Sequence, residues 1–269
     1  MISNKKNIRE QTNLVKKVLP RNSWVLSSYA PANIFGWQDF FEFEITPIDG
    51  ATAIFAKNES GIFMILPPLG AVAESVIDKC FNEMEDINQG RGVSRVENVP
   101  AWMLRSFSDE TFEFFLKGHE YCYYRQDIVD LGGGAYKSKR NAYNHFQKNH
   151  EAEYKDFQEE MIPECLELYK QWVNERKLNN VNEIYQHMLD ENYDFHRRVM
   201  ENHVVFDLVG RVVCVDNKIK GYTFGTALND KVFCVILEVV DLNMKGLASY
   251  ISREFCNDVS LRRFAFINA

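Results

Sequence analysis

Two segments that lie far apart in the chain share one pattern, and this repeat constrains the fold more than any other feature. Each segment runs from an apolar strand-like stretch through a short glycine-containing loop into a helix-like stretch with regularly spaced apolar residues. The segments are 61–84, GIFMILPPLGAVAESVIDKCFNEM, and 231–255, KVFCVILEVVDLNMKGLASYISREF. The repeat predicts two related α/β units. Chance similarity between unrelated α/β segments is the alternative.

The length and composition of the chain agree with two domains. Its 269 residues exceed the usual size of a single domain, and 46% of them are hydrophobic, which is enough to build sizeable cores. We therefore expect an α/β (α+β) protein of two tandem domains, residues 1–134 and 135–269. Each is expected to hold a mixed, largely antiparallel sheet flanked by helices.

The spacing of apolar residues and the positions of turn-forming residues predict the order of the elements. In the first domain we expect a helix at 8–18, antiparallel strands at 40–45, 52–57 and 62–66, a helix at 71–84, a strand at 93–99, a short helix at 101–105 and a strand at 121–126. In the second we expect a strand at 151–157, helices at 163–176 and 182–200, strands at 204–209, 211–215, 218–227 and 231–239, a helix at 245–257 and a closing strand at 262–267. Each domain would then contain its own antiparallel meander.

A local basic segment stands out from an acidic chain. The net charge of −7 argues against general nucleic-acid binding, but Tyr136 to His150 contains four Lys or Arg residues and no acid. The cations follow three glycines and crowd the start of a predicted connecting helix, where partial positive charge already disfavours them. The segment is therefore either an anion-binding site facing a cleft between the domains or a solvated helix face. The residues that would bind the anion or substrate are Lys137, Lys139, Arg140, Asn141 and Asn144.

Cysteine and histidine patterns indicate neither disulfides nor a metal site. The six cysteines occur singly, without a CxxC pair, and several lie in apolar runs, as is typical of buried reduced thiols. His187 and His196 are not at metal-ligand spacing. We see neither a stretch long enough to span a membrane nor a signal peptide, so we expect a cytoplasmic protein without an integral membrane segment.

Glu238 is the candidate catalytic residue. It is the one charged residue in the apolar run from Val232 to Val240. A carboxylate in such a strand is costly to bury, and desolvation would raise its pKa toward the range that suits a general base. An edge position with the side chain in water is the alternative. Strand alternation predicts that Glu238 shares a face with Cys234 and Ile236.

The order strand, two helices, antiparallel meander, helix, strand resembles the GCN5-related acyltransferase fold. In that fold a loop of the form (Gln/Arg)-x-x-Gly-x-(Gly/Ala), at the start of the helix after the fourth strand, holds the pyrophosphate of the donor. Here the corresponding residues are Asn243, Lys245, Gly246, Leu247 and Ala248, with Asn243 in place of Gln or Arg. Small residues allow close approach of the backbone, and a helix N-terminus favours an anion. The alternative is a purely structural role, in which Gly246 only starts a core helix.

Together, the segments 124–146, 221–225, 235–255 and 264–269 resemble bacterial proteins akin to the C-terminal domain of phosphatidylglycerol lysyltransferases. The resemblance is strongest at Lys139-Arg140-Asn141, Glu238, Gly246 and Asn268, and we add Asn268 to the candidate substrate-binding residues. It implies two acyltransferase-like domains and transfer of an aminoacyl group from a tRNA ester to a lipid hydroxyl. In the family, further residues usually follow the motif that ends at Asn268, so we expect an incomplete or degenerate C-terminal domain.

Two functions remain open from the sequence. The first is an acyl- or aminoacyltransferase that uses acyl-CoA or aminoacyl-tRNA as donor and a small-molecule or lipid acceptor, with no permanently bound cofactor. Glu238 would take the proton from the attacking amine or hydroxyl, and backbone amides would stabilise the oxyanion. The second is a non-catalytic ligand-binding module on a duplicated acyltransferase scaffold.

Overall fold

The computed structural model describes residues 8–19, 26–70 and 73–269, and contacts divide the chain into two compact units. The boundary falls between Glu120 and Tyr121, ahead of the position after residue 134 that we expected. The reason is that β5 (Cys122–Tyr124) pairs antiparallel with β10 (Phe266–Asn268) and so belongs to the second unit.

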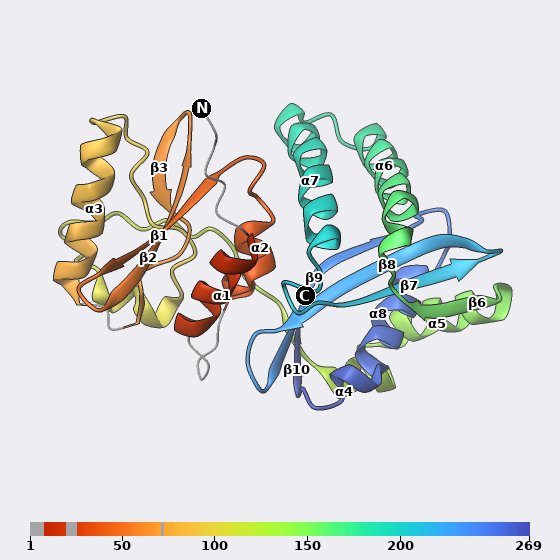
Figure 1. Ribbon diagram of the computed structural model, residues 1–269. Helices are drawn as coiled ribbons and strands as arrows, with labels where there is room; N and C mark the ends of the chain where they lie inside the picture. Colours follow the sequence, from red (N-terminus) through yellow and green to blue (C-terminus); the bar gives the residue numbers. More distant parts are fainter. Residues whose placement is uncertain (1–7, 20–25, 71–72) are drawn as a thin grey trace. The chain divides into compact units, whose positions relative to one another are not determined.

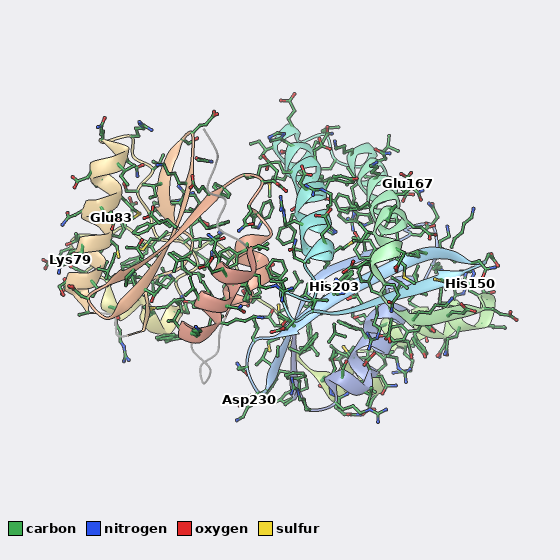
Figure 2. The ribbon with its side chains drawn as sticks, viewed as in Figure 1. Lys79, Glu83, His150, Glu167, His203 and Asp230 are labelled. Carbon is green, nitrogen blue, oxygen red and sulfur yellow. The ribbon has the colours of Figure 1, made fainter. Side chains whose placement is uncertain are left out.

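The first unit contains the predicted meander. Strands β1 (Glu42–Ile48), β2 (Ala51–Asn58) and β3 (Gly61–Met64) pair antiparallel in that order, and the short β4 (Leu69–Gly70) also pairs with β2. The preceding helices are α1 (Ile8–Val18) and α2 (Pro31–Phe35). Helix α3 (Glu74–Asn88) packs on the sheet through Val76, Cys80 and Met84. Lys79 of α3 stays exposed and pairs with Asp49 (Figure 2).

Two expected elements of the first unit differ. The predicted strand at 93–99 is only an isolated bridge, in which Val96 pairs with Met64 and the backbone of Met64 bonds to Arg95 and Glu97. The short helix begins at the expected residue but is a 3₁₀ helix, Ala101–Ser106. The first two residues of the predicted helix at 71–84 lie outside the described residues.

The second unit is built on a six-stranded mixed sheet with the order β5-β10-β9-β8-β7-β6. Its longer strands are β6 (Ala152–Asp156), β7 (Val209–Val215), β8 (Lys218–Ala227) and β9 (Val232–Val240). Strands β6 to β9 pair antiparallel, so the second predicted meander is confirmed, whereas β9 and β10 run parallel. The predicted strand at 204–209 is wrong over most of its length, because Val204 to Asp207 form turns that carry the chain from α7 (Glu183–Glu201) into β7.

Helices cover both faces of this sheet (Figure 1). One face carries α6 (Ile162–Leu178) and α7 (Glu183–Glu201), and the other carries α4 (Arg125–Asp130), α5 (Lys137–Asn149) and α8 (Leu247–Asn257). Charged side chains such as Glu167 lie on the outside of α6 (Figure 2). The buried His196 of α7 lies 2.7 Å from the Tyr222 hydroxyl of β8, so this histidine belongs to the core.

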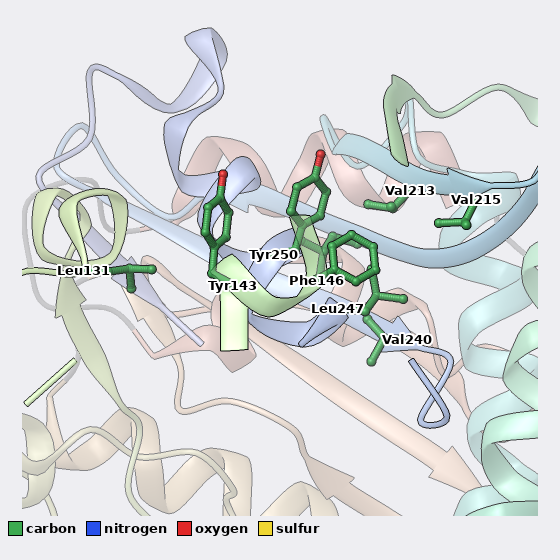
Figure 3. Close-up of a cluster of buried hydrophobic side chains, with 9 residues drawn as sticks. Leu131, Tyr143, Phe146, Val213, Val215, Val240, Leu247 and Tyr250 are labelled. Carbon is green, nitrogen blue, oxygen red and sulfur yellow. The ribbon is translucent and has the colours of Figure 1, made fainter. Parts of the chain in front are cut away.

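An apolar cluster fixes α5 and α8 on the sheet (Figure 3). Tyr143 and Phe146 of α5 pack with Leu247 and Tyr250 of α8. Arg253 of α8 adds polar ties, since it donates to the Tyr143 hydroxyl and to the carbonyl of Val129 in α4, each at 2.7 Å. The three helices therefore form one layer, which positions the candidate site.

The described residues contain neither a membrane-spanning helix nor a cluster of metal ligands. None of their helices is long and apolar enough to cross a membrane. They also contain no cluster of His, Cys, Asp and Glu that suits a metal ion.

Candidate active site on the second unit

Glu238 lies on the face of the sheet that α8 and α5 cover. Its strand neighbour Val240 packs with Leu247 and Ile251 of α8, and residues two apart in a strand share a face. The prediction that Glu238 shares its face with Cys234 is wrong. Between β8 and β9 the register shifts at Phe224/Gly225, so Ile236 is an extra residue and the alternation changes side.

The electrostatic environment of Glu238 favours its protonated form. Burial raises the pKa of this carboxyl to about 7, and the nearby Lys139 ammonium partly opposes that rise. The side chain is nonetheless exposed to solvent, so water offsets part of the effect of burial on this pKa. Within the described chain, no hydrogen bond or ion pair holds the carboxylate. The carboxyl group is therefore accessible to solvent, and its pKa is raised toward neutral pH, as a general base requires.

The neighbours of Glu238 come from three elements. Thr223 is directly opposite it on β8. Lys139 of α5 lowers the pKa of Glu238, and Glu238 in turn helps burial to raise the pKa of the Cys256 thiol of α8 to about 12. A carboxylate, an ammonium and a hydroxyl thus come together on one face, although they are far apart in sequence.

The glycine-rich loop before α5 wraps around Arg140. The guanidinium donates to the carbonyl of Leu131 and, at 3.1 Å, to that of Gly133. Leu131 and Gly133 both have positive φ, which turns the loop back toward the helix. Carbonyl oxygens therefore face the cation, and they offset the repulsion expected for a cation in the first turns of a helix.

We expect Arg140→Lys to destabilise the protein by about 1–2 kcal/mol, because the shorter lysine side chain does not reach the position from which Nη1 of Arg140 donates to both carbonyls. Urea unfolding measures the change. The matched control is Lys148→Met on the exposed surface of the same helix, which should change stability by less than about 0.5 kcal/mol. Equal stability of Arg140→Lys and the native protein would contradict a structural role for Arg140.

The other candidate anion-binding residues of α5 split into two groups. Lys137, Asn141 and Asn144 are exposed, and Lys137 forms no salt bridge within the described chain. Lys139 projects from another side of the helix and acts on Glu238. That Lys137, Arg140 and Asn144 face a cleft between the domains stays a prediction.

The loop that starts α8 has a packing role. Gly246 has φ +94°, and a Cβ atom there would lie 2.1 Å from the carbonyl oxygen of Ala142. The close approach that we expected for a donor phosphate is thus made by the backbone of α5. Leu247 is fully buried, whereas Lys245 and Ala248 are exposed.

Asn243 is tied to a carboxylate. Its side-chain amide donates to Glu175 of α6 at 2.6 Å, and its backbone N–H donates to Asp241 at 3.0 Å. Lys220 pairs with Asp241 at 2.8 Å and neutralises its charge. Glu175 therefore supplies the negative charge beside this loop. A pyrophosphate would meet that charge, which weakens the prediction of a coenzyme A site here.

Asn268 is buried at the end of β10, where it pairs in register with Cys234 of β9 and Cys122 of β5. Its neighbour Ile267 packs with Phe255 and Cys256 of α8, so Asn268 points to the opposite face from Glu238. The structure therefore brings Lys139 to Glu238 but places Asn268 on the other side of the sheet.

Thr223 did not stand out as a site residue in the sequence. Its position within the strand GYTFG was visible, but its pairing with Glu238 depends on a register that the bulge at Ile236 sets. Pairing a polar residue in one predicted strand with each charged residue in the next would have found it.

Comparisons with known proteins agree with this architecture. A model of the family described as phosphatidylglycerol lysyltransferase, C-terminal, matches residues 25–269. No curated protein matches the sequence significantly.

Solved structures share the fold at low identity. A conserved protein of unknown function from Bacteroides thetaiotaomicron has a TM-score of 0.79 at 19% identity, over 98% of this chain and 88% of that one. L-PGS from Bacillus licheniformis has a TM-score of 0.67 at 12% identity, over 97% and 74%. The C-terminal domain of a putative lysylphosphatidylglycerol synthetase from Agrobacterium fabrum has a TM-score of 0.62 at 10% identity, over 98% and 79%.

Proposed function

Because the chain belongs to the family of phosphatidylglycerol lysyltransferase C-terminal domains, we propose that it transfers an aminoacyl group from the ester of a charged tRNA to a hydroxyl or amine. The observation that carries this proposal is the accessible carboxylate of Glu238, whose pKa burial raises to about 7, beside the Lys139 ammonium. A group that titrates near neutral pH exchanges protons efficiently at that pH.

The proposed reaction needs one proton acceptor. Glu238 takes the proton as the acceptor's oxygen or nitrogen attacks the ester carbonyl, and the proton then passes to the ribose oxygen that leaves. The bond from carbonyl carbon to ribose oxygen breaks as the new ester or amide forms. The bulge at Ile236 supplies a backbone amide outside the regular ladder, close to Glu238, that suits the developing oxyanion.

The charges favour a tRNA donor over acyl-CoA. Lys137, Lys139 and Lys148 are exposed on α5, and the described residues give them no salt bridge, so they suit a polyanionic backbone. Glu175 beside Asn243 disfavours a pyrophosphate at the start of α8. We retain Lys137, Asn141 and Asn144 as donor-contacting residues on this basis. We give no donor role to Gly246 or to Arg140, whose guanidinium donates to loop carbonyls.

The acceptor we propose is the hydroxyl of an anionic lipid such as phosphatidylglycerol, after the family's description. We also propose that the two units arose by duplication. Support comes from the order of elements, since each unit has an antiparallel meander, β1-β2-β3 or β7-β8-β9, followed by a helix, α3 or α8.

A transfer assay tests the proposal. The protein is incubated with tRNA charged with one radiolabelled amino acid at a time and with phosphatidylglycerol vesicles, and lipid-soluble label is counted. We expect label in the lipid with at least one aminoacyl-tRNA. Transfer from acyl-CoA but not from any aminoacyl-tRNA would overturn the proposed donor. No transfer from any donor would favour the alternative of a binding module without catalytic activity.

A further inference from the structure

The hydroxyl of Thr223 is a buried polar group that the fold does not use. The residue is fully buried, and its Oγ1 atom has no hydrogen-bond partner within the described chain. A buried hydroxyl left unpaired destabilises the folded state. Valine has nearly the same shape without this cost, so the fold alone gives no reason for a hydroxyl here.

Thr223 and Glu238 are direct cross-strand partners on one face of the sheet. They are paired in the register of β8 and β9. Gly221, two residues before Thr223, faces Ile251 of α8, which places Thr223 on the same face as Glu238. Directly opposite residues have Cβ atoms about 5 Å apart. Rotation of the longer Glu238 side chain is enough to bring its carboxylate to the hydroxyl.

The other groups near Glu238 are poor substitutes for this hydroxyl. Lys139 of α5 contributes charge but no hydrogen bond, and Cys256 of α8 offers a thiol, which is a weak donor. Thr223 thus has a donor without an acceptor, and Glu238 has an acceptor without a donor.

We infer that Thr223 is a positioning residue whose hydroxyl donates a hydrogen bond to the ionised Glu238 carboxylate and holds it in the orientation that accepts the proton. The hydrogen bond is independent of any reaction, whereas its consequence for catalysis rests on the proposed function. Because the bond favours the ionised carboxylate, its loss should raise the pKa of Glu238.

The test uses Thr223→Val, which removes the hydroxyl, and Thr223→Ser, which keeps it. The matched control is Thr226→Val on the same strand, because the Thr226 hydroxyl donates to the carbonyl of Asp207 at 3.2 Å and not to Glu238. The Glu238 carboxyl is titrated by carbon-13 NMR, with its resonance assigned from the Glu238→Gln variant. The melting temperature is measured for each variant.

We expect the pKa of Glu238 to rise by about one pH unit in Thr223→Val, and to stay near the native value in Thr223→Ser and Thr226→Val. Thr223→Val should lower the melting temperature above the pKa of Glu238, where the ionised carboxylate loses its hydrogen bond, whereas Thr226→Val should lower it at every pH. In the transfer assay, Thr223→Val should lower kcat about tenfold, move the pH profile upward and leave KM for the tRNA unchanged.

Two results separate the hydrogen bond from the reaction. An unchanged Glu238 titration in Thr223→Val overturns the inference whatever the transfer assay gives. A shifted titration in a protein that transfers nothing supports the hydrogen bond and overturns only the proposed function.

Discussion

Replacement of Glu238 by glutamine is expected to lower the transfer rate by at least about 100-fold, because the amide keeps the size of the side chain but cannot accept a proton. Single-turnover kinetics with charged tRNA measures the change. The matched control is Glu167→Gln on the outside of α6, on the opposite face of the sheet, which should transfer at the native rate. A Glu238→Gln protein that transfers normally would remove Glu238 from the mechanism.

The effect of Glu238→Gln on the stability of the protein depends on pH in a predictable direction. The pKa of Glu238 is raised above its ordinary value of 4.5, so the folded state keeps its proton where the unfolded chain has lost it. This contribution to stability is present below about pH 4.5 and is lost as pH rises through about 7. The free energy of unfolding of Glu238→Gln, measured relative to that of the native protein, should therefore be higher at pH 8 than at pH 5. Solvent access to the side chain keeps this difference small.

Gly246→Ala is expected to destabilise the second unit by about 3–5 kcal/mol, the largest effect on folding that we predict. The added Cβ would lie 2.1 Å from the carbonyl oxygen of Ala142, and φ of +94° is unfavourable for any residue with a side chain. In thermal unfolding the loss corresponds to roughly 10 °C. Circular dichroism measures both the melting temperature and the helical content.

Gly132→Ala is the matched control for this substitution. A Cβ atom at Gly132 would meet nothing within 4 Å, so its melting temperature should stay near the native value. If Gly246→Ala melts with the native protein, then α8 does not pack on α5 as described. Loss of donor binding in a normally stable Gly246→Ala protein would instead return this glycine to the donor site.

Much of the fold was predictable because it depends on local patterns. Helix α1 spans its predicted residues, and β8 does the same. The run YRQDIVD was harder, since its aromatic start forms β5 but its remainder forms α4 from Arg125 onward. Arg125 bonds to the carbonyls of Phe264 and Cys256, so residues more than 100 positions away help to hold this helix in place. A prediction from neighbouring residues in the sequence cannot include such contacts.

The candidate site was predictable only in part, and for physical reasons. Glu238 stood out because a carboxylate in an apolar strand is costly. Its face was predicted wrongly because one extra residue at Ile236 reverses the alternation. Arg140 looked like an anion-binding cation, yet loop carbonyls occupy it, and these depend on backbone angles at Leu131 and Gly133. The partner Thr223 required the register of two strands.

The pH dependence of transfer tests most directly the claim that Glu238 is the general base. The single-turnover rate of the native protein is measured from pH 5 to 9 beside that of Glu238→Gln. We predict that the native rate rises with pH through a midpoint near 7, where burial places the pKa of Glu238, and that this step is absent from the residual rate of Glu238→Gln. The same midpoint in both proteins would contradict the account.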